Sequence, residues 1–67
     1  MNDVVNWDDF VRDVWHLLGK HPKKTTTLIK ACNVYVLEKW GVDQVWRVPA
    51  EERKHLLDWL KELTERE

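Results

Sequence analysis

The stretch WDDFVRDVWHLLG, Trp7–Gly19, decides the fold class of this 67-residue chain. At about 100° per residue, its apolar side chains fall within an arc of about 160°, and its charged side chains fill the opposite side. Asn6 comes before the stretch as an N-cap residue, and Gly19 stands where helices commonly stop. The pattern therefore predicts an amphipathic helix over residues 7–18. Its apolar arc, expected to face the core, consists of Trp7, Phe10, Val11, Val14, Trp15, Leu17 and Leu18.

A second helix is predicted over residues 25–40, with Gly41 as its stop signal. Its main apolar stripe comprises Leu28, Ile29, Cys32, Tyr35, Val36 and Trp40. The run VYV within it also suits a strand, but the length of the segment and the spacing of the stripe favour a helix. Val34 and Leu37 point the other way, beside Lys30. A helix that is apolar on two sides lies either in the centre of a bundle or against another molecule.

The third helix is predicted over residues 49–64. Pro49 is a favoured first helical residue, and Glu51 and Glu52 follow in the first turn, where the helix dipole favours acids. Residues 42–48 form a connector that can hold a short extra helical turn at 43–47. We expect a single all-α domain over residues 1–67, a compact three-helix bundle.

The size and composition of the chain suggest a partner. A core this small supplies only about 3–5 kcal/mol, and a single cysteine, Cys32, excludes an internal disulfide. The lone thiol fits a reducing compartment, and no signal peptide or membrane-spanning run is visible, so we expect a cytoplasmic protein. Five tryptophans are difficult to cover in 67 residues, which suggests that some lie at an interface.

The sequence offers no constellation typical of catalysis. His16, His21 and His55 have no nearby residue at the spacing of a metal ligand or a catalytic triad. Asp9 and Asp13 share one helix face, as metal-binding carboxylates can, but a solvated acidic face is the simpler interpretation. We expect no enzyme, no metal or other cofactor, and no small-molecule substrate.

The segment GKHPKKTTT, Gly19–Thr27, is the most basic part of the chain. Residues 20–30 carry four bases and no acid, whereas the segments on either side are acidic. No Walker pattern is present, but lysines placed before a helix N-terminus can hold an anion, with threonine hydroxyls capping the helix or contacting phosphate. The residues predicted for such an anion or nucleic-acid contact are Lys20, Lys23, Lys24, Thr25, Thr26 and Lys30.

The segment WRVPAEER, Trp46–Arg53, resembles a stretch of small phage repressors of the Cro type, in which a tryptophan and then VPAE follow the recognition helix. A helix-turn-helix does not fit around it. With Ala31 as the small residue of the first helix, the turn falls on Tyr35 and a core position falls on Gly41. With Gly41 as the turn glycine, the recognition helix runs into Pro49, which costs about 3 kcal/mol. Neither frame leaves a helix of recognition length, so the family is not assigned.

We therefore expect a small module that binds a protein, either itself as a homo-oligomer or a larger partner. Tiny tryptophan-rich proteins without motifs are typical of those by which phages and mobile elements inhibit or adapt host machinery. The alternative is a small dimeric DNA- or RNA-binding regulator that uses residues 20–30. No membrane contact is expected. The predicted protein interface comprises Val34, Leu37, Trp40, Trp46 and Arg53.

Overall fold

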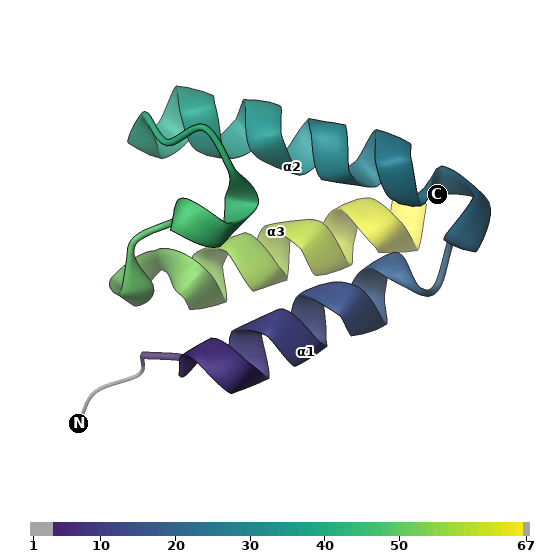
Figure 1. The fold of residues 1–67 in the computed structure, drawn as a ribbon. Helices are drawn as coiled ribbons and strands as arrows, with labels where there is room; N and C mark the ends of the chain where they lie inside the picture. Colours follow the sequence, from purple (N-terminus) through teal and green to yellow (C-terminus); the bar gives the residue numbers. More distant parts are fainter. Residues whose placement is uncertain (1–3, 67) are drawn as a thin grey trace.

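The computed structural model describes residues 4–66, and residues 1–3 and 67 lie outside the described part. The described residues form no strand and three α-helices: α1 (Trp7–Leu18), α2 (Thr25–Trp40) and α3 (Arg53–Arg66) (Figure 1). Three 3-10 turns accompany them: η1 (Pro22–Lys24), η2 (Val45–Arg47) and η3 (Ala50–Glu52). The predicted all-α three-helix bundle is confirmed, and the run VYV is helical.

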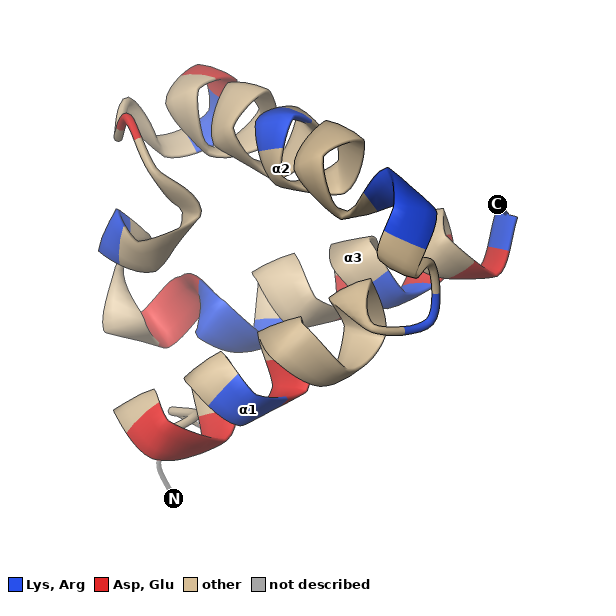
Figure 2. Cartoon of the chain, turned by 45° about the vertical axis from the view of Figure 1, so that its right-hand side comes forward, with Lys and Arg blue, Asp and Glu red and all other residues tan. Residues whose placement is uncertain are grey.

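The helices form two layers, with α1 and α3 packed against each other and α2 lying over them (Figure 1, Figure 2). The α2 backbone approaches η1 and η2 closely, so the turns at either end of this helix help to hold it in place. The start of α1, η2, η3 and the start of α3 gather at one end of the bundle (Figure 1). The end of α1, η1, the start of α2 and the end of α3 gather at the other.

All three helices and the connector contribute to one core, because each presents an apolar stripe that burial removes from water. The buried hydrophobic residues are Phe10, Val14, Leu17, Leu18, Leu28, Cys32, Val36, Val45, Val48, Leu56 and Leu60. Between residues 4 and 66, no helix has the length and apolar content needed to cross a lipid bilayer.

The predicted start of α1 is confirmed. The Asn6 side-chain oxygen accepts a hydrogen bond of 2.8 Å from the backbone N–H of Asp9, and Asn6 has an extended backbone, as N-cap residues do. Asp8 and Asp9 occupy the first turn, where the helix dipole favours acids. The chemistry of four consecutive residues is thus enough to fix where this helix begins.

The predicted end of α2 is also confirmed, because Gly41 has a left-handed backbone with φ of 71°. Its N–H donates to the Leu37 carbonyl at 3.0 Å, and this bond closes the last turn. An added Cβ would meet no atom within 4 Å, so backbone strain alone opposes a side chain at this position.

Gly41→Ala is expected to lower the free energy of unfolding by about 1–2 kcal/mol, the cost of a left-handed alanine. The measurement is urea denaturation followed by circular dichroism. Gly41→Asn is the matched control, since asparagine tolerates this conformation, and it should lose less than the alanine variant. Equal losses for the two variants would contradict the assignment of the cost to the backbone.

The third helix differs from its predicted bounds of 49–64. Pro49 is extended, with ψ of 143°, and its carbonyl accepts the N–H of Glu52 at 2.8 Å, so the first turn is the 3-10 turn η3 and α3 begins at Arg53. At the other end α3 continues to Arg66, which pairs with Glu62 at 2.6 Å. In the connector, η2 provides the short turn expected at 43–47, at residues 45–47.

Candidate functional site

Three tryptophans form a continuous aromatic surface on one flank of α1. Trp7 and Trp15 lie two helical turns apart, and Trp46 from η2 packs between them, with ring centroids 6.2 Å from Trp7 and 6.0 Å from Trp15. Trp7 and Trp15 remain 47% and 50% exposed, whereas Trp46 is half-buried. Val11, also half-buried, occupies the helix position between the two exposed indoles. We call Trp7, Val11, Trp15 and Trp46 the aromatic face.

The aromatic face is held in place by a buried ring below it and by a hydrogen bond to α2. Phe10 is fully buried, and its ring meets Trp46 edge-on, with centroids 6.0 Å apart and planes at 82°. The backbone N–H of Val45 donates to the side-chain oxygen of Asn33 on α2 at 3.0 Å, which ties η2 to that helix. The indoles are therefore held in an ordered arrangement although two of them are half exposed.

Arg53, predicted as an interface residue, is engaged within the chain. Its guanidinium carbon lies 5.5 Å from the ring centroid of Trp7 and 5.7 Å from that of Phe10, within the range of cation–π contacts. One terminal nitrogen donates to the Val5 carbonyl at 2.9 Å. The Nε atom is buried and makes no hydrogen bond within residues 4–66. Arg53 thus joins the start of α3 to the start of α1, beneath the edge of the aromatic face.

The other predicted interface residues lie on different parts of the surface. Val34 and Leu37 are 56% and 55% exposed and mark the outer face of α2, turned away from its buried stripe. Trp40 is half-buried and meets Tyr35 and His55 edge-on, with centroids 5.7 Å and 5.9 Å away. Trp46 belongs to the aromatic face. The structure therefore does not gather the five predicted residues into one patch.

A second aromatic cluster joins α2 to α3. Tyr35 stacks on Trp59, with centroids 4.1 Å apart and planes at 7°, and its hydroxyl lies 3.0 Å from the Nε2 atom of His55. Trp40 packs against both Tyr35 and His55. The four rings pack on one another and Tyr35 and His55 share a hydrogen bond, so this cluster is best explained as packing between two helices.

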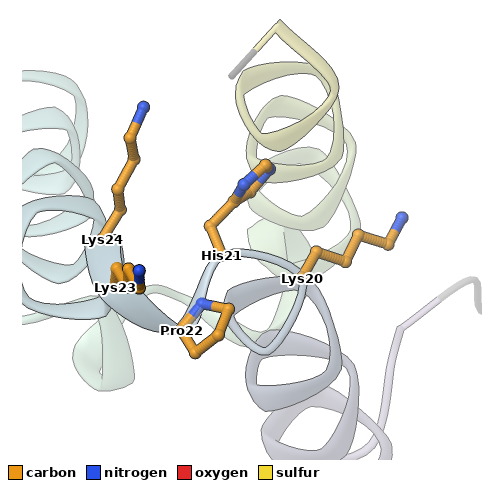
Figure 3. A pocket seen from close by; sticks show the side chains of 5 residues that line it. All are labelled: Lys20, His21, Pro22, Lys23 and Lys24. Carbon is orange, nitrogen blue, oxygen red and sulfur yellow. The ribbon is translucent and has the colours of Figure 1, made fainter.

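The predicted anion-binding residues lie around η1. Lys20, His21, Pro22, Lys23 and Lys24 line a shallow hollow, in which the side chains of Lys20 and Lys24 point away from each other (Figure 3). Thr25 donates its hydroxyl to the Pro22 carbonyl at 3.2 Å, and α2 has Lys24 at its N-cap position with no side-chain cap. The threonines therefore do not cap α2 as expected, because η1 leads directly into the helix. Thr26 and Lys30 are exposed further along α2.

His21 ties this end of the bundle to the last helix. Its Nε2 atom lies 2.7 Å from the Thr64 carbonyl, which can only accept, so Nε2 carries the hydrogen and donates it. The ends of α1 and α3 meet here beside the start of α2 (Figure 1). Each helix C-terminus carries about −0.5 charge and the single N-terminus about +0.5, so this end favours cations on balance. The helix dipoles at this end therefore do not oppose the lysines of residues 20–24 as strongly as the start of α2 alone would.

The remaining residues considered for catalysis or metal binding have structural explanations. Arg12 pairs with Asp9 at 3.1 Å and with Asp13 at 3.5 Å, so both carboxylates belong to an exposed ion-pair network. Burial raises the pKa of the Cys32 thiol to about 11, which keeps it protonated and unreactive at neutral pH. In the described part of the chain, no three histidine, cysteine or acidic side chains gather as a metal site.

Sequence reasoning missed Trp7 and Trp15 as functional candidates, because it placed both in the arc expected to face the core. Trp15 lies at one edge of that arc, whereas Trp7 lies near its centre but is the first residue of the helix. For Trp15, the width of the arc was the available signal, since about 160° is more than one neighbouring helix covers.

In comparisons with known proteins, no family model, no curated protein and no solved structure matches this chain.

Proposed function

We propose that this protein acts by binding another protein, as an adaptor or inhibitor, and that the aromatic face is its main contact surface. The observation that carries the proposal is that Trp7 and Trp15 remain half exposed although both pack against Trp46. Tryptophan is among the residues most enriched at binding hot spots. Indoles that are already ordered lose little conformational freedom on binding, which raises the affinity they can provide.

The outer face of α2 is the second contact surface in this proposal. Val34 and Leu37 are more exposed than either indole, and one helical turn separates them. We assign self-association to this face, as a homodimer. We place both contacts in the cytoplasm, where the free Cys32 would stay reduced.

Trp15→Ala is expected to weaken binding of the partner at least tenfold, because truncating an interface anchor removes the contact without disturbing the core. Immobilised wild-type protein would capture host proteins for identification by mass spectrometry, and calorimetry on the purified partner would measure affinity. His16→Ala, at an exposed neighbouring position on the charged side of α1, is the matched control. A partner that binds wild type and Trp15→Ala equally would contradict the proposed surface.

Self-association has its own test. Light scattering over a tenfold concentration range should show a rising mass for the wild type and a constant monomer mass for Leu37→Asp, since a buried unpaired carboxylate opposes association. Trp15→Ala should behave as the wild type in this measurement. A strict monomer at every concentration would remove the homodimer from the proposal and leave the foreign partner.

The second candidate function is nucleic-acid binding by the basic end. It is favoured by one observation: the hollow at η1 is lined by three lysines and a histidine without a carboxylate (Figure 3). About four neutralised phosphates would give a slope near −3.6 in a plot of log affinity against log salt. If mixed DNA binds at low salt, and Lys23→Glu with Lys24→Glu abolishes binding while Trp15→Ala does not, this candidate replaces protein binding.

A further inference from the structure

We propose that the partner of the aromatic face is a short, positively charged protein segment that places an arginine against the exposed indoles. This inference rests on the proposed protein-binding function and adds the chemistry of the partner. Three properties of the surface carry it: its size, the charges around it and the contact that Arg53 already makes on it.

The size of the aromatic face fits a short segment. A tryptophan side chain offers about 250 Å² at most, so two half-exposed indoles leave on the order of 250 Å² of aromatic surface in solvent. A stable interface between two globular proteins buries about 800 Å² on each side. The aromatic face alone is therefore too small to centre such an interface, but it suits a peptide that contributes one or two anchoring side chains.

The charges at the end of the bundle where the aromatic face begins favour a cation. Asp8, Glu51 and Glu52 lie in the first turns at this end, and within residues 4–66 their carboxylates make no ion pair or side-chain hydrogen bond. Figure 2 shows the acidic start of α1 at the end of the bundle opposite the lysines that begin α2. The N-termini of α1 and α3 supply about +0.5 each, which offsets roughly one of the three negative charges.

The basic side chains at this end offset only part of the remaining charge. Arg12 pairs with Asp9 and Asp13, and Arg47 pairs with Asp43 at 3.3 Å. Arg53 contacts two rings and the Val5 carbonyl but makes no ion pair within residues 4–66, so its positive charge offsets one further negative charge. Because Arg12 faces two carboxylates and the other acids here have no ion pair, this end of the bundle keeps a small excess of negative charge. That excess is complementary to a basic segment and raises its association rate.

Arg53 also shows which cation suits these rings. Its guanidinium already lies over Trp7 and Phe10 from the protein side. Trp15, at the other end of the aromatic face, has half of its surface open and no cation within residues 4–66 over its ring. Planar guanidinium stacks on an indole better than the compact lysine ammonium, so an incoming arginine is the expected ligand of Trp15.

The test uses three synthetic twelve-residue peptides that share a neutral Gly-Ser backbone and one leucine and differ in four positions, which are all arginine, all lysine or all glutamate. Binding to the full chain would be followed by tryptophan fluorescence and calorimetry at two salt concentrations. We expect affinity in the order arginine, lysine, glutamate, with no detectable binding of the glutamate peptide. Trp15→Ala should weaken binding of the arginine peptide at least tenfold.

Charge variants distinguish binding of the peptide at the aromatic face from general electrostatic attraction to the protein. Asp8→Lys with Glu51→Lys should weaken binding of the arginine peptide at least fivefold and reduce its salt dependence. Glu65→Lys, an exposed acid near the end of α3, is the matched control and should leave the affinity within twofold. Binding that ignores Trp15→Ala, or that Glu65→Lys weakens as much as the double change, would overturn the inference.

The same experiment distinguishes this inference from the proposed function. A natural partner whose contact segment is neutral or acidic, and whose binding still requires Trp15, would overturn the cationic segment and leave protein binding standing. If neither the arginine peptide nor any captured partner depends on Trp15, both proposals fall.

Discussion

Replacing Phe10 with alanine is expected to leave most of the protein unfolded at 25 °C. Phe10 is fully buried and contacts both Trp7 and Trp46, and the Arg53 guanidinium lies over its ring. Truncating a buried phenylalanine costs about 3–5 kcal/mol, because apolar contacts are lost and a cavity remains. A core in a chain of this size supplies only about 3–5 kcal/mol in total. The loss is therefore comparable to the whole stability of the domain.

Far-UV circular dichroism and urea titration would measure the effect of Phe10→Ala. The expected result is a large loss of helical signal without denaturant. Val34→Ala provides the control, since Val34 is 56% exposed and its truncation should change the free energy of unfolding by less than about 0.5 kcal/mol. A cooperative, nearly wild-type transition for Phe10→Ala would show that the core does not depend on this ring.

Raising the pH from 8.5 to 11 is expected to destabilise the protein through Cys32 by roughly 2–3 kcal/mol. Burial raises the pKa of this thiol from 9.0 to about 11. Because the unfolded chain loses the proton first, stability is fully present below pH 9 and is lost as the pH rises toward 11. A pKa raised by about two units corresponds to about 2.7 kcal/mol of folding free energy.

Cys32→Ala isolates this contribution, since every other titrating group is common to both proteins. The variant should be less stable near pH 8, because it lacks the buried Cys32 sulfur, but its stability should fall less steeply between pH 9 and 11. Urea denaturation at four pH values would compare the two slopes. Parallel pH profiles would mean that the thiol ionises as readily in the folded protein as in the unfolded chain.

The helix boundaries that could be predicted from the sequence are those specified by neighbouring residues. Asn6 caps α1 through Asp9, the third residue of the same helix, and Gly41 ends α2 because its own backbone is left-handed. The predicted start of α3 was less accurate. Pro49 and the acids after it do mark a helix start, but Pro49 remains extended and the first turn is 3-10.

The candidate site was harder to predict, because exposure depends on what packs nearby. Val34 and Leu37 are exposed on α2, as their position off the main stripe suggested. Trp7 and Trp15 have the same helical spacing as core residues, yet Trp46, which packs on both, and Arg53, which lies over Trp7, leave each about half exposed. The spacing of apolar residues within α1 does not indicate how much of its surface the neighbouring elements cover.

The amino-acid sequence by itself determined the number of helices, their approximate bounds and the absence of an internal disulfide, because these depend on local periodicity, capping residues and composition. The tertiary structure alone decided which tryptophans stay exposed and which helix ends lie beside the lysines near residue 20. Arg53 reaches Val5 across 48 positions of sequence, and His21 reaches Thr64 across 43. Contacts between residues so far apart hold each end of the bundle together, and they exist only once the helices have packed.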